Sequence, residues 1–431
     1  MIVRGGTVVT ERGVEQADIA IANGQITEVG PGLRGGGEEI DASGLHVFPG
    51  GIDSHVHFNE PGRTEWETIA NGSAALAAGG YTTFIDMPLN NLPVTTDVAA
   101  FDLKRQAMER SSLIDFGLWA GLVPGNVKRV EELAERGAMG FKAFMCPSGI
   151  PEFPPCDERT LRDAMKRIAR LDSILLLHAE DPSKLREPKG PSARDFLDSR
   201  PEDAETSAVG QATAWASRYG NRLHIVHLSL ADSAAFVGAG QGKGIDVSGE
   251  TCPHYLLYSE DELATLGGIG KCAPPFRSRD SVNRLWNALL EGWIEIVVSD
   301  HSPSTLLLKE GDDFTKIWGG ISGCQSTRQL LLAKEWLDLP IIASLTSTNI
   351  ARRFRLDQKG DIAPGFDADL WLVDLSSEDV VRREDLLYLN PFSVHEGQPI
   401  RGKTVRTLVR GRTVFPDGQQ VGEFIRPGAS S

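Results

Sequence analysis

Eight short apolar runs recur along the central part of the chain, and stretches with helical character separate them. Residues 130–136 and 158–169 are two of these helical stretches. The predicted strands are the run before His55 and residues 81–86, 115–121, 140–144, 174–178, 223–227, 245–248 and 294–299. Repeated strand and helix units are typical of a parallel sheet, and eight of them predict an α/β protein with a (β/α)8 TIM-type barrel, whose active site lies at the carboxyl ends of the strands.

Both ends of the chain show a different sequence pattern, which predicts short strands joined by tight turns. A hairpin is expected around Asn23-Gly24, a pair that favours a type I′ turn. Similar strands return at residues 368–374 and 404–415. We therefore expect two domains, a small discontinuous β-sandwich from residues 1–50 and 360–431 and the barrel from residues 51–359.

Charge and cysteine content exclude several classes of protein. The formal charge is −15 at pH 7 and no basic run is present, which argues against a nucleic-acid partner, because such binding relies on clustered Lys and Arg. The N-terminus turns polar too early for a signal peptide, and no apolar stretch approaches the roughly 20 residues that span a bilayer. Five cysteines without a CxxC spacing indicate neither a disulfide framework nor a thiolate metal site. We expect a cytoplasmic protein without membrane contact.

Side chains that can bind metal recur where the predicted strands end. His55 and His57 are two residues apart, so in a strand they share one face and can chelate one ion. Imidazole suits zinc and similar divalent metals. Four other strands end in comparable residues, namely Lys142, His178, His227 and Asp300. Any one of the histidines could also be a hydrogen-bonded core or surface residue, but the recurrence at strand ends favours a metal site.

Lys142 is unusual because it lies inside the apolar run Gly140–Phe144. Burial penalises the ammonium form and lowers the pKa of a lysine. A neutral amine can react with carbon dioxide to form a carbamate, an anion whose two oxygens can bridge two cations. A lysine that extends its ammonium out of the strand end explains the same pattern, so the residues alone leave both possibilities open.

Two further histidines are weaker candidates for metal ligands. His224 lies three residues before His227 and faces away from it on a strand, so we expect His224 to be structural. His301 directly follows Asp300, and its role stays open.

Together with their neighbours, these residues resemble the cyclic amidohydrolases of the amidohydrolase superfamily. This group includes allantoinases, hydantoinases, dihydropyrimidinases and dihydroorotases. The resemblance extends over nearly the whole chain, and its motifs are specific in combination, whereas the His-x-His pair alone would be weak evidence. The motifs lie in Asp41–His57, Gly140–Met145, Leu176–Asp181, Ile225–Ser229, Glu250–Tyr255 and Ser299–Pro303.

The resemblance implies a site with two divalent metal ions and a hydroxide between them. Its six ligands would be His55, His57, carboxylated Lys142 as the bridge between the ions, His178, His227 and Asp300. It also implies that Asp300 takes a proton from the hydroxide during attack and returns it to the departing amide nitrogen. Zinc is the default metal, and cobalt, manganese, iron and nickel accept the same ligands.

The residues after the His-x-His pair separate the members of this group. Dihydroorotases place an arginine two residues after the second histidine, where this chain has Asn59. Asparagine cannot form the charged fork that arginine makes with a substrate carboxylate. Hydantoinases and dihydropyrimidinases show a tyrosine shortly after the bridging lysine, and Lys142–Gly149 contains none. The chain instead resembles allantoinases in residues 58–67, 86–91, 148–150 and 318–325.

We therefore expect hydrolysis of the cyclic amide of allantoin to allantoate, a step in purine breakdown. Allantoin is a neutral ureide, so its recognition needs amide-type donors and acceptors. The candidate contacts are Asn59, Asn90, Ser148, Ser302, Ser304 and Gln325. Any one of these residues could instead serve a turn or a helix cap.

A hydantoinase or dihydropyrimidinase that acts on another neutral cyclic ureide is the main alternative, and a dihydroorotase is a weaker one. Noncatalytic relatives of dihydropyrimidinase that serve in assembly typically lose metal ligands, whereas all six positions remain here. The resemblance also implies a homo-oligomer, either a tetramer or a dimer. The glycine-rich stretch Gly319–Gly323, after the charged residues 309–313, is either a mobile lid over the site or a rigid turn.

Overall fold

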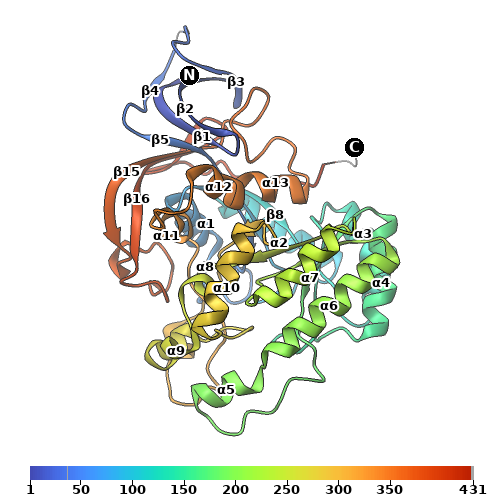
Figure 1. The fold of residues 1–431 in the computed structure, drawn as a ribbon. Coiled ribbons are helices and arrows are strands. Elements are labelled where there is room, and N and C mark those ends of the chain that lie inside the picture. Colours follow the sequence, from blue (N-terminus) through green and yellow to red (C-terminus); the bar gives the residue numbers. More distant parts are fainter. Residues whose placement is uncertain (36, 429–431) are drawn as a thin grey trace.

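The computed structural model describes residues 1–35 and 37–428, which form a barrel and a separate β-sheet beside it (Figure 1). Eight strands of the described chain, from both of its ends, make up that sheet in the order β17-β16-β15-β5-β1-β2-β3, with β4 paired to β1. They are β1 (Ile2–Thr10), β2 (Gly13–Ala22), β3 (Gln25–Gly30), β4 (Glu39–Asp41), β5 (His46–Pro49), β15 (Leu370–Val380), β16 (Pro399–Val409) and β17 (Arg412–Phe415).

Strand pairing joins the two ends of the chain. β5 runs antiparallel to β15, with Val47 opposite Leu372, and parallel to β1. β2 and β3 form the predicted hairpin, in which Asn23 and Gly24 have φ values of 53° and 81°, as a type I′ turn requires. Buried aliphatic side chains, among them Ile19, give this sheet a core of its own. The shared β unit that we expected from the two chain ends is confirmed.

The barrel contains eight parallel strands in the described chain, with β8 and β9 as two parts of one strand that is interrupted at Trp119. Hydrogen bonds close the ring, because the His57 N–H donates to the carbonyl of His301 at 2.7 Å and Val56 forms a parallel bridge with His301. The predicted (β/α)8 barrel is thus confirmed. Its strands are β6 (Gly51–Val56), β7 (Tyr81–Asp86), β8 (Asp115–Leu118), β9 (Ala120–Gly121), β10 (Phe141–Phe144), β11 (Ile174–His178), β12 (Arg222–Ile225), β13 (Val247–Thr251) and β14 (Ile296–Val297).

Several strands differ from their predicted limits, and β12 ends at Ile225, two residues before its predicted end. β13 begins at Val247 because the N–H of Ile245 still bonds to the carbonyl of Gly240 at the end of the preceding helix. β14 is only two residues long. Beyond it, the N–H of Ser299 faces the Asp53 carboxylate at 3.3 Å instead of a neighbouring strand.

Helices alternate with the strands around the outside of the barrel (Figure 1). They are α1 (Ile69–Ala78), α2 (Val98–Ser111), α3 (Val130–Glu135), α4 (Glu158–Arg170), α5 (Ala193–Ser199), α6 (Glu202–Tyr219), α7 (Ala231–Gln241), α8 (Pro253–Leu257), α9 (Glu260–Leu266), α10 (Arg279–Leu290), α11 (Thr327–Leu332), α12 (Leu339–Ala343) and α13 (Asn349–Phe354), with short turns η1 (Val127–Arg129), η2 (Gly267–Gly270), η3 (Leu306–Lys309), η4 (Ser344–Thr348) and η5 (Arg383–Asp385).

Local sequence explains where several helices begin and end. The Asp157 side chain caps α4 by accepting from the Thr160 N–H, and α4 turns Leu161 and Ile168 into the core. Gly220 ends α6 in a left-handed conformation with φ 66°. None of the helices in the described part of the chain combines the length and the hydropathy of a bilayer span.

Candidate active site

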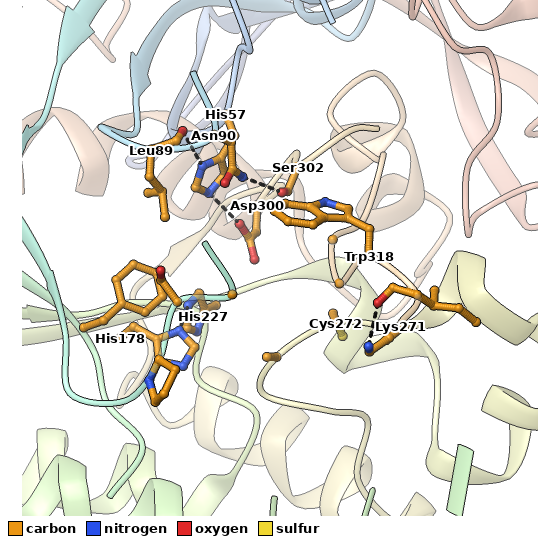
Figure 2. A pocket seen from close by; sticks show the side chains of 18 of the residues that line it. His57, Leu89, Asn90, His178, His227, Lys271, Cys272, Asp300, Ser302 and Trp318 are labelled. Atoms are coloured by element: carbon orange, nitrogen blue, oxygen red, sulfur yellow. Dashed lines mark hydrogen bonds and ion pairs between the residues drawn. The ribbon is translucent and has the colours of Figure 1, made fainter. Parts of the chain in front are cut away.

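A cavity of about 330 Å³ lies at the carboxyl ends of the barrel strands (Figure 2). Cavities of this size suit small molecules. Five different barrel strands, or the turns that directly follow them, bring the predicted metal ligands to its wall. These side chains are His55, His57, Lys142, His178, His227 and Asp300, and the structure gathers all six in one place.

His55, His57 and Asp300 form the first group of ligand-type side chains. Asp300 Oδ1 lies 3.1 Å from His55 Nε2 and 3.5 Å from His57 Nε2. Asp300 has φ 46°, a conformation that is uncommon for a residue with a side chain and that recurs at functional sites. Burial acts to raise the pKa of Asp300, but the charges and hydrogen bonds of the histidines hold it well below its usual range. Asp300 is therefore ionised and able to bind a cation.

His178 and His227 form the second group. His178 Nδ1 lies 3.0 Å from His227 Nε2, and the His178 ring stacks on Phe144 with centroids 4.6 Å apart. Burial lowers the pKa of both imidazoles, most strongly that of His227. Two neutral rings whose nitrogens approach each other this closely are suited to share one cation.

Lys142, on β10, lines the same cavity as both groups, and its charge helps to lower the pKa of His57, His178 and His227. Its Nζ is buried without a hydrogen-bond partner in the described chain and lies 4.7 Å from the centroid of the Phe144 ring. Burial lowers the pKa of Lys142 to about 7, although Glu250 and Asp300 act to raise it. The amine is therefore held close to its neutral, nucleophilic form.

This set of donors fits divalent cations. Single ligand atoms of His55, His57 and Asp300 all lie within 4.8 Å of one another. Lys142 Nζ and His227 Nδ1 are buried and have no partner among the described residues, whereas buried polar atoms in proteins are nearly always satisfied. Imidazole nitrogens, a carboxylate and unpaired buried donors around one cavity indicate a place for metal ions.

Glu250, at the cavity end of β13, is a site residue that the sequence analysis missed. Glu250 Oε1 lies 2.5 Å from His55 Nδ1, and Oε2 lies 3.0 Å from His224 Nε2. Burial opposes its ionisation, but the two histidines lower the pKa of Glu250 to about 2. The carboxylate therefore fixes the orientation of His55, whose other ring nitrogen faces Asp300. Its place at the end of a predicted strand was the signal that could have identified it.

Glu180 orients the second group in the same way and was also missed. Glu180 Oε2 lies 2.7 Å from His178 Nε2, and Arg200 donates to both carboxylate oxygens. Burial acts to raise the pKa of Glu180, but the charge of Arg200 and the bond to His178 hold it well below its usual range. Its position two residues after His178 placed it beside a predicted ligand in the sequence.

His224 and His301 both lie outside the cavity wall. The His224 ring is buried, with Nδ1 2.7 Å from Ser248 Oγ, in agreement with the structural role that we expected. His301 Nδ1 accepts from the Gly323 N–H at 3.2 Å, so Nε2 carries the proton and lies 3.7 Å from Glu67 Oε2. His301 thus supports the segment around Gly323.

Asn90, Ser148 and Ser302 are the predicted substrate contacts that line the cavity. Asn90 Nδ2 donates to Ser302 Oγ at 3.2 Å, and Ser148 Oγ donates to the carbonyl of Phe153 at 2.6 Å. These residues present hydroxyl and amide groups beside the ligand-type cluster, which suits a neutral polar substrate. Ser304 is buried outside the wall.

Asn59 and Gln325 do not lie in the cavity wall, which corrects their expected direct contact with the substrate. Asn59 is fully buried, and its Nδ2 donates to the carbonyl of Asn90 at 3.2 Å. Gln325 Nε2 donates to the carbonyl of Asp385 at 2.7 Å, and Oε1 accepts from the Leu387 N–H at 2.8 Å. Asn59 therefore contacts the cavity wall through Asn90, and Gln325 holds a neighbouring loop.

Comparison with known sequences gives one consistent result. The sequence model of the amidohydrolase family matches residues 46–414. Proteins called allantoinase from Rubrobacter xylanophilus and Solibacter usitatus are 50% and 48% identical to this chain, over 99% and 100% of it and 97% of each relative. A third, from Deinococcus radiodurans, is 43% identical over 98% of this chain and 96% of its own length.

Solved structures with a similar fold carry related names. The L-hydantoinase (dihydropyrimidinase) from Arthrobacter aurescens superposes with a TM-score of 0.95 at 29% identity, over 99% of both chains. The dihydropyrimidinase from Brevibacillus agri superposes with a TM-score of 0.90 at 27% identity, over 99% of this chain and 98% of the other.

Proposed function

The chain belongs to the amidohydrolase family, and from this premise we propose that it is an allantoinase, which hydrolyses the hydantoin-ring amide of allantoin to allantoate. The observation that best supports hydrolysis as the reaction is that six ligand-type side chains line one cavity. The substrate is supported by the 50% identity to a relative called allantoinase, against 29% to an L-hydantoinase. Because both share the fold, sequence identity is the better guide to the substrate here.

Two divalent ions are part of this proposal, because the donor set of the cavity fits them. When bound, the ions would lower the pKa of a water molecule and polarise the scissile carbonyl. Zinc is the default, and cobalt, manganese, iron and nickel accept the same ligands. The residues that would hold the ions are His55, His57 and Asp300 for one, His178 and His227 for the other, and carboxylated Lys142 for both.

Lys142 would serve as a carbamate. Its amine, with a pKa lowered to about 7, attacks carbon dioxide, an N–C bond forms, and the nitrogen releases one proton to water. The product is an anion in place of a buried donor that otherwise has no partner in the described chain. Such an anion would be stabilised at this position when the two groups of ligands on either side of it hold divalent cations.

Asp300 would move the proton during ring opening. Its carboxylate is held ionised beside His55 and His57, so it can accept a proton from the attacking water. It then delivers this proton to the ring nitrogen as the C–N bond breaks, because an amide nitrogen would otherwise leave as a very poor anionic group. Glu250 keeps His55 in the orientation that faces Asp300.

Turnover of four rings by the metal-loaded enzyme tests the proposal. We expect allantoin to be hydrolysed with a higher kcat/KM than hydantoin, dihydrouracil or dihydroorotate. A lower value for allantoin than for the other rings would refute the specific substrate but leave a cyclic amidohydrolase standing. A hydantoinase or dihydropyrimidinase is the second candidate, since the superposed solved structures carry those names.

Three further predictions remain proposals. We infer a cytoplasmic setting, which is supported by five cysteines that are all free and buried in the structure. We infer a homo-oligomer, a tetramer or a dimer, which light scattering after size-exclusion chromatography would measure. We also infer a division at residues 50 and 360 between the barrel and the β domain, supported by the separate core of the sheet.

A further inference from the structure

Lys271 lies in the cavity wall directly after η2. Figure 2 shows it on the opposite side of the cavity from His178 and His227. Lys271 Nζ donates to the carbonyl oxygen of Phe314 and, at 2.6 Å, to that of Ile317. An ammonium has three N–H donors. The third has no hydrogen-bond acceptor among the described residues, although the centroid of the Phe196 ring lies 5.0 Å from Nζ, so this donor is available to a ligand in the cavity.

The surroundings of Lys271 favour an oxygen acceptor from a ligand. The residue is only 8% exposed, and its hydrogen bonds go to carbonyl oxygens. Burial and the charge of Arg200 lower the pKa of Lys271 to about 8, and Asp313 opposes them, which leaves the group mostly charged near neutral pH. A buried ammonium N–H that lacks an oxygen acceptor is costly, so a ligand oxygen that accepts from the third N–H of Lys271 would be bound favourably.

A second lysine holds the same part of the chain without reaching the cavity. Residues 314–320, the roof segment, contribute Ile317 and Trp318 to the cavity wall. Lys309 Nζ donates to the carbonyl oxygens of Trp318, at 2.9 Å, and of Gly320, but Lys309 is outside the wall. Both lysines therefore brace the roof segment. Of the two predictions for this part of the chain, these contacts favour a rigid turn and argue against a mobile lid. Of these two lysines, only Lys271 faces the cavity.

We propose that Lys271 donates its third N–H to the ureido oxygen of allantoin and so selects cyclic ureides that carry a second carbonyl arm. The inference rests on the proposed function. The ureido arm is attached to the ring carbon next to the scissile carbonyl, so with that carbonyl beside His55 and Asp300 the arm can extend across the cavity toward the side where Lys271 lies (Figure 2). Hydantoin has the same ring without the arm and cannot make this contact. A charge-assisted hydrogen bond gives such a distinction.

The test compares wild type, Lys271→Met and Lys309→Met as metal-loaded enzymes. It measures the KM of allantoin and the inhibition constant of hydantoin as a competitor of allantoin. In Lys271→Met, we expect the KM to rise about 10- to 100-fold, as for one lost charge-assisted hydrogen bond, and at least about 10-fold more than the hydantoin constant, which responds only to the loosened roof segment. Lys309→Met disturbs only the roof segment and should shift both constants by the same factor. Lys271→Arg keeps the charge and should recover part of the affinity for allantoin.

Melting temperature and metal content establish that each variant is folded and loaded. If Lys271→Met does not fold, Lys271→Gln, which keeps a donor for the roof segment but no charge, provides the same comparison. Equal shifts of both constants in the Lys271 variant, or an unchanged KM, would overturn the inference. Failure of the wild type to hydrolyse allantoin would instead refute the proposed function, and the wild-type measurement alone reveals it.

Discussion

Two clusters of buried charged side chains lie at opposite ends of the barrel and differ in how completely they are paired. At the carboxyl ends of the strands, Lys142 Nζ has no partner among the described residues, and burial lowers its pKa to about 7. At the amino end of β8, Lys359 Nζ lies 2.5 Å from Asp115 Oδ2 and 2.8 Å from Asp369 Oδ2. Burial acts to lower the pKa of Lys359 as well, but these carboxylates raise it above its usual value.

The difference shows that partners, and not burial, decide what a buried lysine does. Asp115, Asp367 and Asp369 are close enough together to hold a cation, but Lys359 bonds to all three and Arg410 also bonds to Asp115. This cluster is complete, which suits a role in stability. The cluster in the cavity leaves donors unpaired, which suits a ligand.

Replacement of Lys142 should have the largest effect. Lys142→Ala removes the proposed bridge, so we expect allantoin turnover near the detection limit and loss of bound metal, with partial rescue by short carboxylic acids that mimic the carbamate. Activity assays and elemental analysis measure both effects. Full activity in Lys142→Ala would show that the unpaired lysine is not functional and would remove the contrast between the two clusters.

Replacement of Asp300 should reduce activity without unfolding the protein. Asp300→Asn cannot accept the proton of the attacking water, so kcat should fall roughly 10²- to 10⁴-fold. Thermal unfolding of the metal-free variant should stay close to that of wild type, because Asp300 belongs to the incompletely paired cluster. A large loss of stability with little loss of kcat would contradict this assignment.

Replacement of Lys359 should have the converse effect. Lys359→Met leaves the buried carboxylates of Asp115 and Asp369 and the half-buried one of Asp367 without their shared cation, which should lower the free energy of unfolding by about 3–5 kcal/mol. Denaturant titration measures this change, and the folded variant should keep the kcat of wild type. Lys243→Met, at an exposed position, is the matched control and should change stability by less than about 0.5 kcal/mol. Equal stability of both variants would mean that the paired cluster does not stabilise the fold.

The pH dependence of substrate binding should show the smallest effect. The pKa of Lys271 is lowered to about 8, so its charge is present below that pH and is lost as the pH rises through it. We expect the KM of allantoin to rise about fivefold above pH 8, because a hydrogen bond from a charged donor is stronger than one from a neutral amine. Lys271→Arg stays charged and should abolish this rise. The same rise in Lys271→Arg would assign it to another group.

The barrel could be predicted because its strands are buried on both faces and appear as apolar runs between helical stretches. The limits of β13 and β14 could not be predicted as well. The N–H of Ser299 bonds to the Asp53 side chain across 246 residues of sequence, and no local sequence pattern predicts that contact. Strand existence is thus a local property, whereas strand length depends on distant partners.

The ligand positions could be chosen from sequence because motifs place them at strand ends, but their supporting contacts could not. Glu250 meets His55 across 195 residues, and Lys359 meets Asp115 across 244. The contact expected of Gln325 was wrong for the same reason, since the loop that uses its amide lies about 60 residues further along the chain. Sequence indicates which residues reach the cavity end of a strand, and packing decides which of them stay unpaired.

Metal stoichiometry is the most direct test of the difference between the two clusters. Wild type and Lys142→Ala would be reconstituted with zinc in bicarbonate buffer, freed of loosely bound metal, and analysed for zinc per chain together with allantoin turnover. We predict two zinc ions per chain in active wild type and a loss of both zinc and turnover in Lys142→Ala. Full turnover by wild type with no bound metal, or two retained ions in Lys142→Ala, would contradict the proposed metal centre.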